Sequence, residues 1–322
     1  MISEYTFGES AGALESPDMG KPMNETVRNG NKIHPFGRTF PTLLHYLSRL
    51  PRWAMPDSKT MRARDDFTAL IGSLTQKAWD RTKAASDYEK SDEVASDNRN
   101  VMRSLIGSND LPPSERTLER TGGEAVILIG AGTETTGRTL AVILYHILAN
   151  RQTFDRLLEE LRSVMSTSHS PLPAAVVLEN LPFLTAVISE GMRMAHGVAG
   201  RLVRIAPDED LQYGKYKIPR GATFSQSQYA YHTNGKNFPD PFSFKPERFL
   251  GPDASKAYKN FAPFGRGSRA CVGLNLAYSE MYLTVAALIA GVKMELVETT
   301  ERDATIVSTR SHSLGCEDKI TG

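Results

Sequence analysis

The stretch PFGRGSRACVG, residues 263–273, surrounds one of only two cysteines in the chain with glycines and arginines. A cysteine kept for packing normally lies among apolar neighbours, whereas a thiolate requires nearby positive charge or a metal. Arg266 and Arg269 flank Cys271, and the apolar run that begins at Leu274 predicts a helix whose free N–H groups lie near the sulfur. The composition of this loop therefore favours a stabilised thiolate.

Three kinds of chemistry use a cysteine thiolate, and the surrounding sequence favours one of them. Zinc would require further Cys or His ligands at close spacing, and the loop contains none. A cysteine nucleophile would require a histidine base, and the seven histidines form no pattern that identifies one, although the fold could bring one close. A single axial thiolate on haem iron is the remaining option, since the porphyrin supplies four further ligands. Taken by itself, however, the loop also fits a buried structural thiol in a turn.

Two further motifs place acidic, basic and hydroxyl side chains at short spacing. In AGTETT, residues 131–136, Glu134 and Thr135 form an acid–alcohol pair that could pass protons, and Thr135 could bond a local carbonyl and open the helix. In EGMR, Glu190 and Arg193 are three residues apart and therefore share one face of a helix. The simpler interpretations are a polar patch that serves packing and a solvated ion pair.

Taken together, the motifs resemble those of cytochrome P450 enzymes, in the same order along the chain. AGTETT is similar to the oxygen-binding groove of the family's central helix, EGMR to its Glu-x-x-Arg pair, and FKPERFL, with Arg248, to the partner motif. The cysteine loop fills every fixed position of the family's haem-binding signature: Phe264, Gly265, Gly267, Arg269, Cys271 and Gly273. The resemblance covers residues 60–322 and is closest to fungal members.

The resemblance implies a haem b cofactor with Cys271 as the axial ligand of the iron. Arg269 and Arg204 are the implied partners of the haem propionates, with Arg201 as a weaker choice. The glycines of the loop would let the backbone approach the porphyrin, and Phe264 would pack beside the sulfur and limit its exposure to water.

The other two motifs receive roles from the same resemblance. Ala131 and Gly132 would let dioxygen sit against the helix, while Glu134 and Thr135 would assist protonation. The remaining motif residues have a structural role, in which a Glu–Arg pair binds the arginine of the partner motif and holds the cysteine loop: Glu190, Arg193 and Arg248.

The implied activity is insertion of one oxygen atom from O2 into a C–H bond of a small hydrophobic substrate. Electrons would come from NADPH through NADPH–cytochrome P450 reductase, and the fungal resemblance suggests a terpenoid or polyketide of secondary metabolism. One alternative is a truncated, non-catalytic remnant that does not hold haem productively. Another is a short haem-thiolate protein that carries out peroxide-driven or rearrangement chemistry.

Hydrophobic periodicity indicates the elements that position these motifs. Helices are predicted at residues 40–56, 60–104, 118–149, 151–165, 181–195 and 274–289. Ser114 is the predicted N-cap before the long apolar helix. Residues 200–232 are typical of small β-hairpins, residues 234–264 are rich in loops, and a β-rich tail follows the last helix. The predicted class is mainly α with a minor β component, the C-terminal portion of a cytochrome P450 fold.

Composition limits the other classes of function. The 322 residues, 40% hydrophobic and 23% charged, are typical of a soluble globular protein, and the net charge of +1 gives no argument for a nucleic-acid partner. The first 20 residues lack the pattern of a signal peptide, and polar residues at 133–138 argue against a membrane-spanning helix, so no membrane anchor is predicted in this chain. Cys316 has no motif around it and is interpreted as incidental.

The resemblance also gives an expectation for domain organisation and location. Residues 1–322 are expected to form a single partial cytochrome P450 domain, in which residues 1–59 are a mid-family segment and residues 60–322 the haem-binding portion. Family members usually begin with a membrane anchor, a hinge, strands and several helices, so the chain is expected to be truncated at its N-terminus. Full-length relatives would lie on the endoplasmic reticulum membrane, while the chain itself gives no location.

Overall fold

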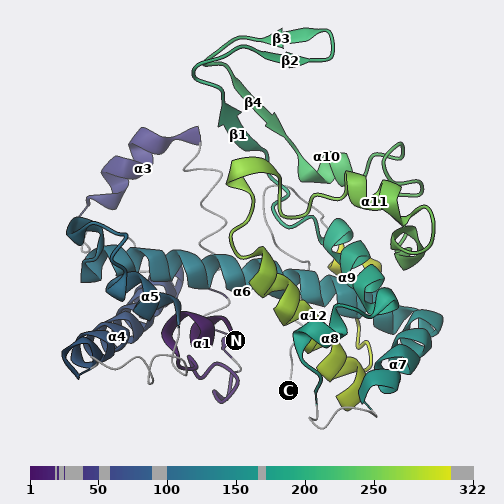
Figure 1. Cartoon of the computed structure of the whole chain (residues 1–322), viewed down its shortest axis with the longest axis horizontal. Helices are drawn as coiled ribbons and strands as arrows, with labels where there is room; N and C mark the ends of the chain where they lie inside the picture. The colour runs from purple at the N-terminus through teal and green to yellow at the C-terminus, as the bar shows by residue number, and fades with distance from the viewer. Residues whose placement is uncertain are drawn as a thin grey trace. The chain divides into compact units, whose positions relative to one another are not determined.

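The computed structural model describes residues 1–18, 20, 21, 25, 39–50, 59–88, 100–165 and 172–305 (Figure 1). The chain divides into two compact units, Met1–Glu134 and Thr135–Gly322, and the division falls within one long helix. Among the helices in these ranges, none is long and apolar enough to cross a membrane. The assignment of residues 1–59 and 60–322 to parts of one family domain stays a prediction.

The first unit is helical and is built around one small core. Its helices pack through apolar positions at a helical spacing, so that Phe7, Ile71, Met102 and Ile129 meet in a buried cluster. The elements are α1 (Ile2–Phe7), α3 (Pro41–Ser48), α4 (Lys59–Tyr88), α5 (Val101–Gly107), the 3₁₀ turn η2 (Pro113–Glu115) and the first half of α6 (Leu118–Ala149).

Two predictions for this unit need correction. The helix predicted over residues 60–104 is not continuous, because α4 ends at Tyr88 and a separate helix, α5, starts after Asn100, whose side-chain oxygen accepts from Arg103 N at 2.9 Å. The predicted cap at Ser114 is also wrong. Ser114 lies in η2, and Thr117 caps α6 by accepting from Arg120 N at 3.2 Å. Residues 89–99, which were expected to fray, lie outside the described residues.

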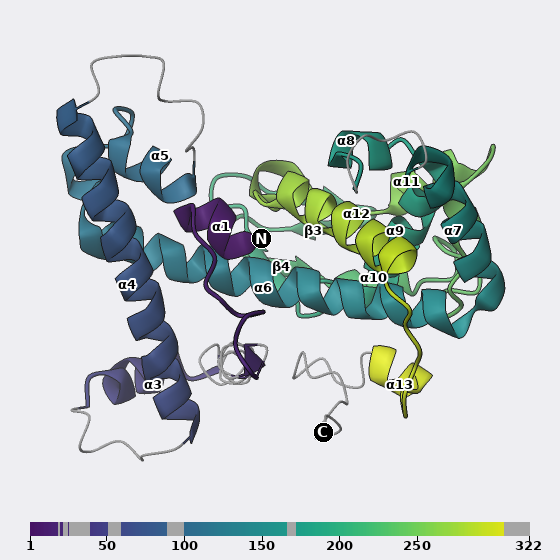
Figure 2. The ribbon, with the colours of Figure 1, turned by 90° about the horizontal axis from the view of Figure 1, so that it is seen from below.

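The second unit holds the larger core, to which five helices contribute. Ile143, Leu157, Leu178, Val187 and Val285, one from each helix, are all fully buried in one cluster. Figure 2 shows α12 together with α7, α8 and α9 on this core. The helical elements after α6 are α7 (Arg151–Met165), α8 (Ala175–Leu178), α9 (Pro182–Ala195), α10 (Gln228–His232), η3 (Pro246–Phe249), α11 (Ala254–Asn260), η4 (Gly267–Arg269), α12 (Leu274–Gly291) and α13 (Glu301–Ala304).

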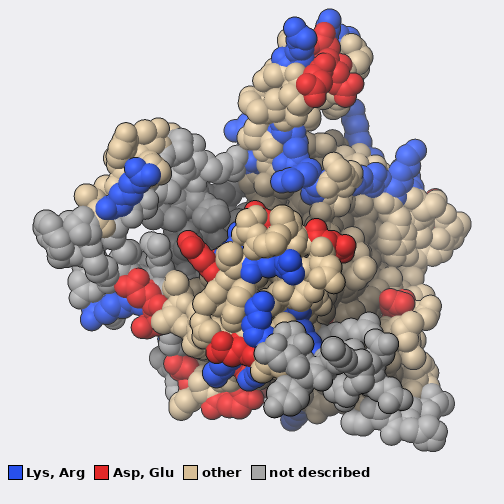
Figure 3. Space-filling model, turned by 60° about the vertical axis from the view of Figure 1, so that its left-hand side comes forward, with Lys and Arg blue, Asp and Glu red and all other residues tan. Residues whose placement is uncertain are grey.

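Two small antiparallel sheets project from this unit. Strand β1 (Leu202–Ile205) pairs with β4 (Thr223–Gln226), and β2 (Leu211–Tyr213) pairs with β3 (Tyr216–Ile218). Every residue of β1 is exposed. Figure 3 shows acidic and basic side chains next to each other at the outer end of the sheets, and basic side chains below them. The outer hairpin is therefore a solvated element of mixed charge.

The helical predictions around the motifs are confirmed, as is the mainly α class with small sheets. α6, α7, α9 and α12 match the predicted helices to within two residues, and the hairpins lie where the alternating pattern placed them. The β-rich tail is not seen within the described residues, where a stretch without strands leads from α12 to α13. Residues 306–322, which include Cys316, lie outside the described residues.

Candidate active site

The cysteine loop is a compact turn that presents Cys271 just before α12. Cys271 N donates to Phe264 O at 2.9 Å, which closes the loop, and the Cys271 side chain is exposed. Gly265 and Gly267 have φ values of 73° and 78°, a left-handed conformation that residues with a Cβ rarely adopt. Gly273 is the N-cap residue of α12. The sulfur therefore lies near the start of a helix, where backbone N–H groups favour negative charge.

The Phe264 ring faces the core. It packs against Tyr278 with ring centroids 5.3 Å apart and joins the large hydrophobic cluster of the second unit. The ring therefore anchors the loop to α12. Because the Cys271 side chain is exposed, the predicted shielding of the sulfur from water by Phe264 is not present in this structure.

The arginines divide into one that holds the loop and others that face solvent. Arg266 Nη2 donates to Lys259 O at 2.6 Å and to Phe261 O at 3.2 Å, so this side chain fastens the loop to the end of α11. Arg269 and Arg204 are exposed, and neither has a carboxylate partner among the described residues. Arg201 is also exposed. The two predicted propionate ligands are thus available to bind an anion.

Glu190 and Arg193 form a fully buried, two-pronged ion pair on α9. Arg193 Nε donates to Glu190 Oε2 and Arg193 Nη2 to Glu190 Oε1, both at 2.8 Å, and both side chains are 0% exposed. A third charge completes the group, because Arg248 Nε donates to Glu190 Oε1 at 2.9 Å. The structure therefore brings together the three residues of the predicted network, and the solvated-pair interpretation does not apply.

Backbone groups satisfy the remaining donors and acceptors of this network. Lys245 N donates to Glu190 Oε1 at 2.9 Å. Arg193 Nη1 donates to the carbonyls of His232 and Pro241 at 3.1 and 2.7 Å, and Arg248 Nη2 to that of Asp240 at 2.8 Å. Such saturation is what allows charges to remain buried. The network ties the loop around residues 239–245 to α9.

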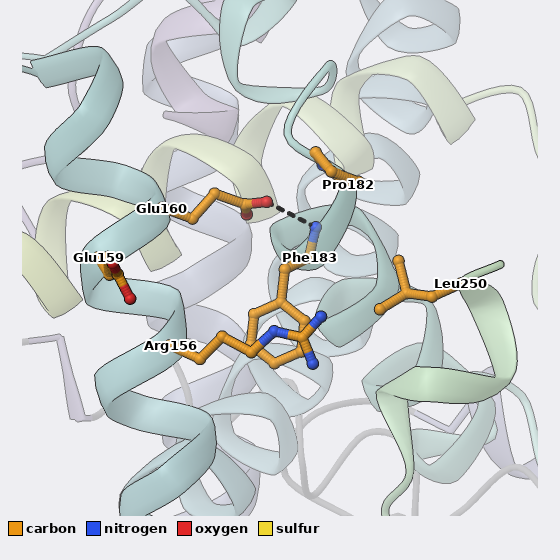
Figure 4. Close-up of a pocket in the computed structure, with 6 residues that line it drawn as sticks. All are labelled: Arg156, Glu159, Glu160, Pro182, Phe183 and Leu250. Carbon is orange, nitrogen blue, oxygen red and sulfur yellow. Dashed lines mark hydrogen bonds between the residues drawn. The ribbon is translucent and has the colours of Figure 1, made fainter.

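The start of α9 is held by a carboxylate of α7. Glu160 Oε1 accepts from Phe183 N at 2.9 Å and Glu160 Oε2 from Leu184 N at 2.8 Å, while Arg156 stacks over the Phe183 ring at 3.9 Å (Figure 4). These side chains line an open pocket of about 240 Å³, smaller than most ligand sites. Glu160 and Arg156 serve the packing of α7 on α9, and none of the lining residues belongs to the cysteine loop.

The AGTETT motif lies in the middle of α6, which is α-helical throughout these residues. The predicted opening of the helix at Thr135 is therefore not seen. Glu134 and Thr135 are half-buried, and Ala131 is exposed. Gly132 is covered on its open side by Ile2, since a Cβ at this position would lie 2.8 Å from Ile2 Cδ1. The small-residue surface predicted to receive dioxygen is occupied by that side chain in this structure.

Sequence reasoning missed several buried polar groups of the second unit. Burial lowers the pKa of His196 to about 3 and that of His232 to about 4, and the Arg193 guanidinium contributes to both shifts. The half-buried Gln228 donates to the carbonyls of Ala262 and Pro263 at the cysteine loop. On α12, burial raises the pKa of Glu280, whose carboxylate is hydrogen-bonded to Thr136 of α6. The left-handed φ of His196, 56°, has no local sequence signal.

The residues at the cysteine loop fit a haem group. Within the described ranges, no group of three or more His, Cys, Asp or Glu side chains could hold a metal. The exposed Cys271 could supply the single thiolate that a haem iron takes as an axial ligand. Exposed guanidiniums suit propionates. Apolar side chains left open to solvent on the loop and on β1 suit a porphyrin: Val272 at 95%, Val203 at 49% and Leu202 at 48% exposure.

Comparison with known proteins identifies the family. The sequence matches the family described as Cytochrome P450 over residues 1–312, so the chain belongs to the cytochrome P450 family. It is 43% identical over 320 residues to Cytochrome P450 monooxygenase ucsK of Acremonium sp, an alignment that covers 96% of this chain and 60% of the relative. Cytochrome P450 monooxygenase TRI4 of Trichoderma arundinaceum is 32% identical over 329 residues, which cover 100% of this chain and 60% of the relative.

A third relative extends the comparison to a protein named for its product. Stellatic acid synthase of Emericella variicolor is 38% identical over 238 residues, 66% of this chain and 46% of that protein. The relatives are fungal proteins, as the sequence motifs indicated. The chain spans about 60% of the length of the first two relatives.

Proposed function

We propose that this chain is the haem-binding portion of a fungal haem-thiolate monooxygenase, with Cys271 as the iron ligand. The observation that carries the proposal is the exposed thiol of Cys271 on a closed, glycine-dependent loop at the start of a helix. When bound, the haem group supplies the reductive activation of dioxygen and the transfer of one oxygen atom to a C–H bond. The chain itself positions the sulfur, binds the propionates and moves protons.

Six predicted site residues, besides Cys271, have a place in this proposal. Arg269 and Arg204 bind the propionates through guanidiniums that have no carboxylate partner among the described residues. Glu134 and Thr135 hold and pass protons on α6. Gly265 and Gly273 leave the loop backbone without side chains, as the approach of a flat cofactor requires.

The proposed substrate rests on similarity to the relatives, and the proposed electron-transfer partner on membership of the family; neither rests on the geometry of the site. The similarity to the fungal monooxygenases and to stellatic acid synthase supports a small hydrophobic secondary metabolite, terpenoid or polyketide, as substrate. Electrons would be supplied from NADPH by NADPH–cytochrome P450 reductase.

The reduced, carbon monoxide-bound absorption spectrum of the haem-reconstituted chain tests the assignment of the ligand. The unchanged chain is expected to give the thiolate-type Soret band, and Cys271→Ser to lose it. The matched control is Cys316→Ser, which removes the other cysteine and should leave the band intact. A thiolate band that persists in Cys271→Ser would remove Cys271 as ligand. No thiolate band in the unchanged chain would favour a remnant that does not hold haem productively.

A further inference from the structure

The short helix α10 makes three hydrogen bonds to the segment that leads into the cysteine loop. Gln228 Nε2 donates to Ala262 O at 2.9 Å and to Pro263 O at 2.7 Å. In the opposite direction, Ala262 N donates to His232 Nε2 at 3.2 Å. Two successive carbonyls and one amide are thus fixed immediately before Phe264, the residue whose own carbonyl accepts from Cys271 N at 2.9 Å.

The same helix is joined to the buried ion-pair network. Arg193 Nη1 donates to His232 O at 3.1 Å, so His232 accepts one bond from the network through its carbonyl and one from the loop through its ring. His232 is 0% exposed, and its ring lies near those of Phe238 and Phe261, with centroids 5.8 and 6.0 Å away. His232 therefore has little freedom to move without moving the loop.

The ring of His232 can accept from Ala262 N only while it is neutral. Burial and the charge of Arg193 lower the pKa of His232 to about 4, which keeps the ring neutral at pH 7. The other titratable groups around it are His196, whose ring centroid lies 6.3 Å away, and Tyr231, at 5.9 Å. The acceptor is therefore present over the ordinary working range of pH.

We propose that α10 is a positioning element for the axial ligand, in which Gln228 and His232 hold the loop so that Cys271 presents its sulfur to the haem iron. This inference rests on the proposed function. None of the hydrogen bonds of Gln228 and His232 reaches the thiol. Both residues act through the backbone at Ala262 and Pro263, and they are positioning residues rather than catalytic ones.

Amide hydrogen exchange of residues 262–271 in the full, haem-free chain tests this directly. Gln228→Ala removes two bonds to the loop, and His232→Phe keeps a ring of similar size but removes the acceptor. In both variants, the amides of residues 262–271 are expected to exchange several-fold to about tenfold faster than in the unchanged chain, because a hydrogen bond is lost. His232→Gln offers a new acceptor and should restore part of the protection.

Asn237→Ala is the matched control for Gln228→Ala. The Asn237 amide also donates to a carbonyl of α10, that of Tyr231 at 3.1 Å, but Asn237 makes no hydrogen bond to the cysteine loop. Its loss should therefore leave exchange at residues 262–271 unchanged. If His232→Phe does not yield folded protein, the comparison of Gln228→Ala with Asn237→Ala decides the test.

The second measurement is the fraction of haem-loaded protein that shows the thiolate-type band with carbon monoxide. Gln228→Ala and His232→Phe are expected to lower this fraction, whereas Asn237→Ala is not. Unchanged exchange and an unchanged thiolate fraction in both loop-side variants would overturn the role of α10. No thiolate band in the unchanged chain would instead overturn the proposed function, and the exchange data would still decide whether α10 fixes the loop.

Discussion

At the scale of single residues, Glu190 is the carboxylate that makes the buried network possible. Its two oxygens accept from the guanidiniums of Arg193 and Arg248 and from Lys245 N, with distances of 2.8 to 2.9 Å. Glu190 and Arg193 have no exposed surface, so water cannot replace a missing partner. The charges of this network are therefore stabilised by one another rather than by water.

Glu190→Gln is expected to lower the free energy of unfolding by about 3–5 kcal/mol, because it leaves two guanidiniums without a counter-charge in a buried site. Urea unfolding followed by circular dichroism measures the loss. The matched control is Asp155→Asn, which breaks the exposed i,i+4 pair with Arg151 on α7, and it should leave stability within error of the unchanged chain. Equal, small effects of both changes would contradict the importance of burial.

A second prediction for a single residue concerns Thr135→Ala, and its expected result follows from the proposed function. The substitution should leave haem bound but lower the ratio of product formed to NADPH consumed, because a hydroxyl that passes protons is lost. Thr121→Ala, in the same helix, is the control, since the Thr121 hydroxyl bonds only carbonyls of its own helix, at 2.9 and 3.2 Å. An unchanged ratio in Thr135→Ala would count against proton delivery by this residue.

At the scale of elements, the network depends on how α9 is fixed against α7. α9 begins with a proline and has no cap from its own N-cap residue, Leu181. Glu160 of α7 takes over that function by accepting from the amides of Phe183 and Leu184. A carboxylate at this end also suits the positive end of the helix dipole. The helix that carries the Glu-x-x-Arg pair is therefore capped from outside.

Glu160→Ala is expected to destabilise the second unit by about 1–2 kcal/mol, as the loss of an N-cap does. Hydrogen exchange at the Phe183 and Leu184 amides should rise with it. The neighbouring Glu159→Ala is a close control, because Glu159 lines the same pocket (Figure 4) but has no hydrogen bond to α9. If both variants behaved alike, the capping role of Glu160 would be wrong.

At the scale of the whole molecule, the histidines of the second unit couple its stability to pH. Burial lowers the pKa of His146 to about 4, of His196 to about 3 and of His232 to about 4, against an ordinary value of 6.5. Between pH 6.5 and these lowered pKa values, the histidines bind protons in the unfolded chain but not in the folded chain. The stability of the unit is therefore complete above about pH 6.5 and falls as the pH decreases toward 4.

The urea midpoint is accordingly expected to fall between pH 7 and pH 4.5. His146→Leu, which keeps an apolar group against the Phe244 ring that His146 stacks on at 4.5 Å, should make this dependence shallower by up to one proton, about 1.4 kcal/mol per pH unit. A midpoint that stays constant over this range would show that the three side chains are not buried in the neutral form.

Local patterns were enough to predict the helices around the motifs and the positions of the motifs. α7 and α9 follow from apolar residues repeated at a helical spacing, and the cysteine loop follows from fixed spacings over about ten residues. The predictions failed where several local solutions compete. The cap of α6 was predicted at Ser114, but Ser114 lies in the preceding 3₁₀ turn, and the hydroxyl that caps the helix is that of Thr117, three residues further on.

The sequence by itself determined the family, the lone cysteine in its loop, and the acidic and basic residues of the partner motifs, because these are carried by residue type and spacing. Tertiary structure alone decided that Gln228 and His232 of α10 hold the backbone at Ala262. It also brings Glu190 to Arg248, 58 residues away, as the family resemblance implied. The hydrogen bonds of Gln228 and His232 to the segment that leads into the cysteine loop end on a main-chain N–H and on main-chain carbonyls, groups that do not depend on the type of side chain. The path from the ion-pair network to Cys271 therefore has no pattern in the sequence and exists only once the chain is folded.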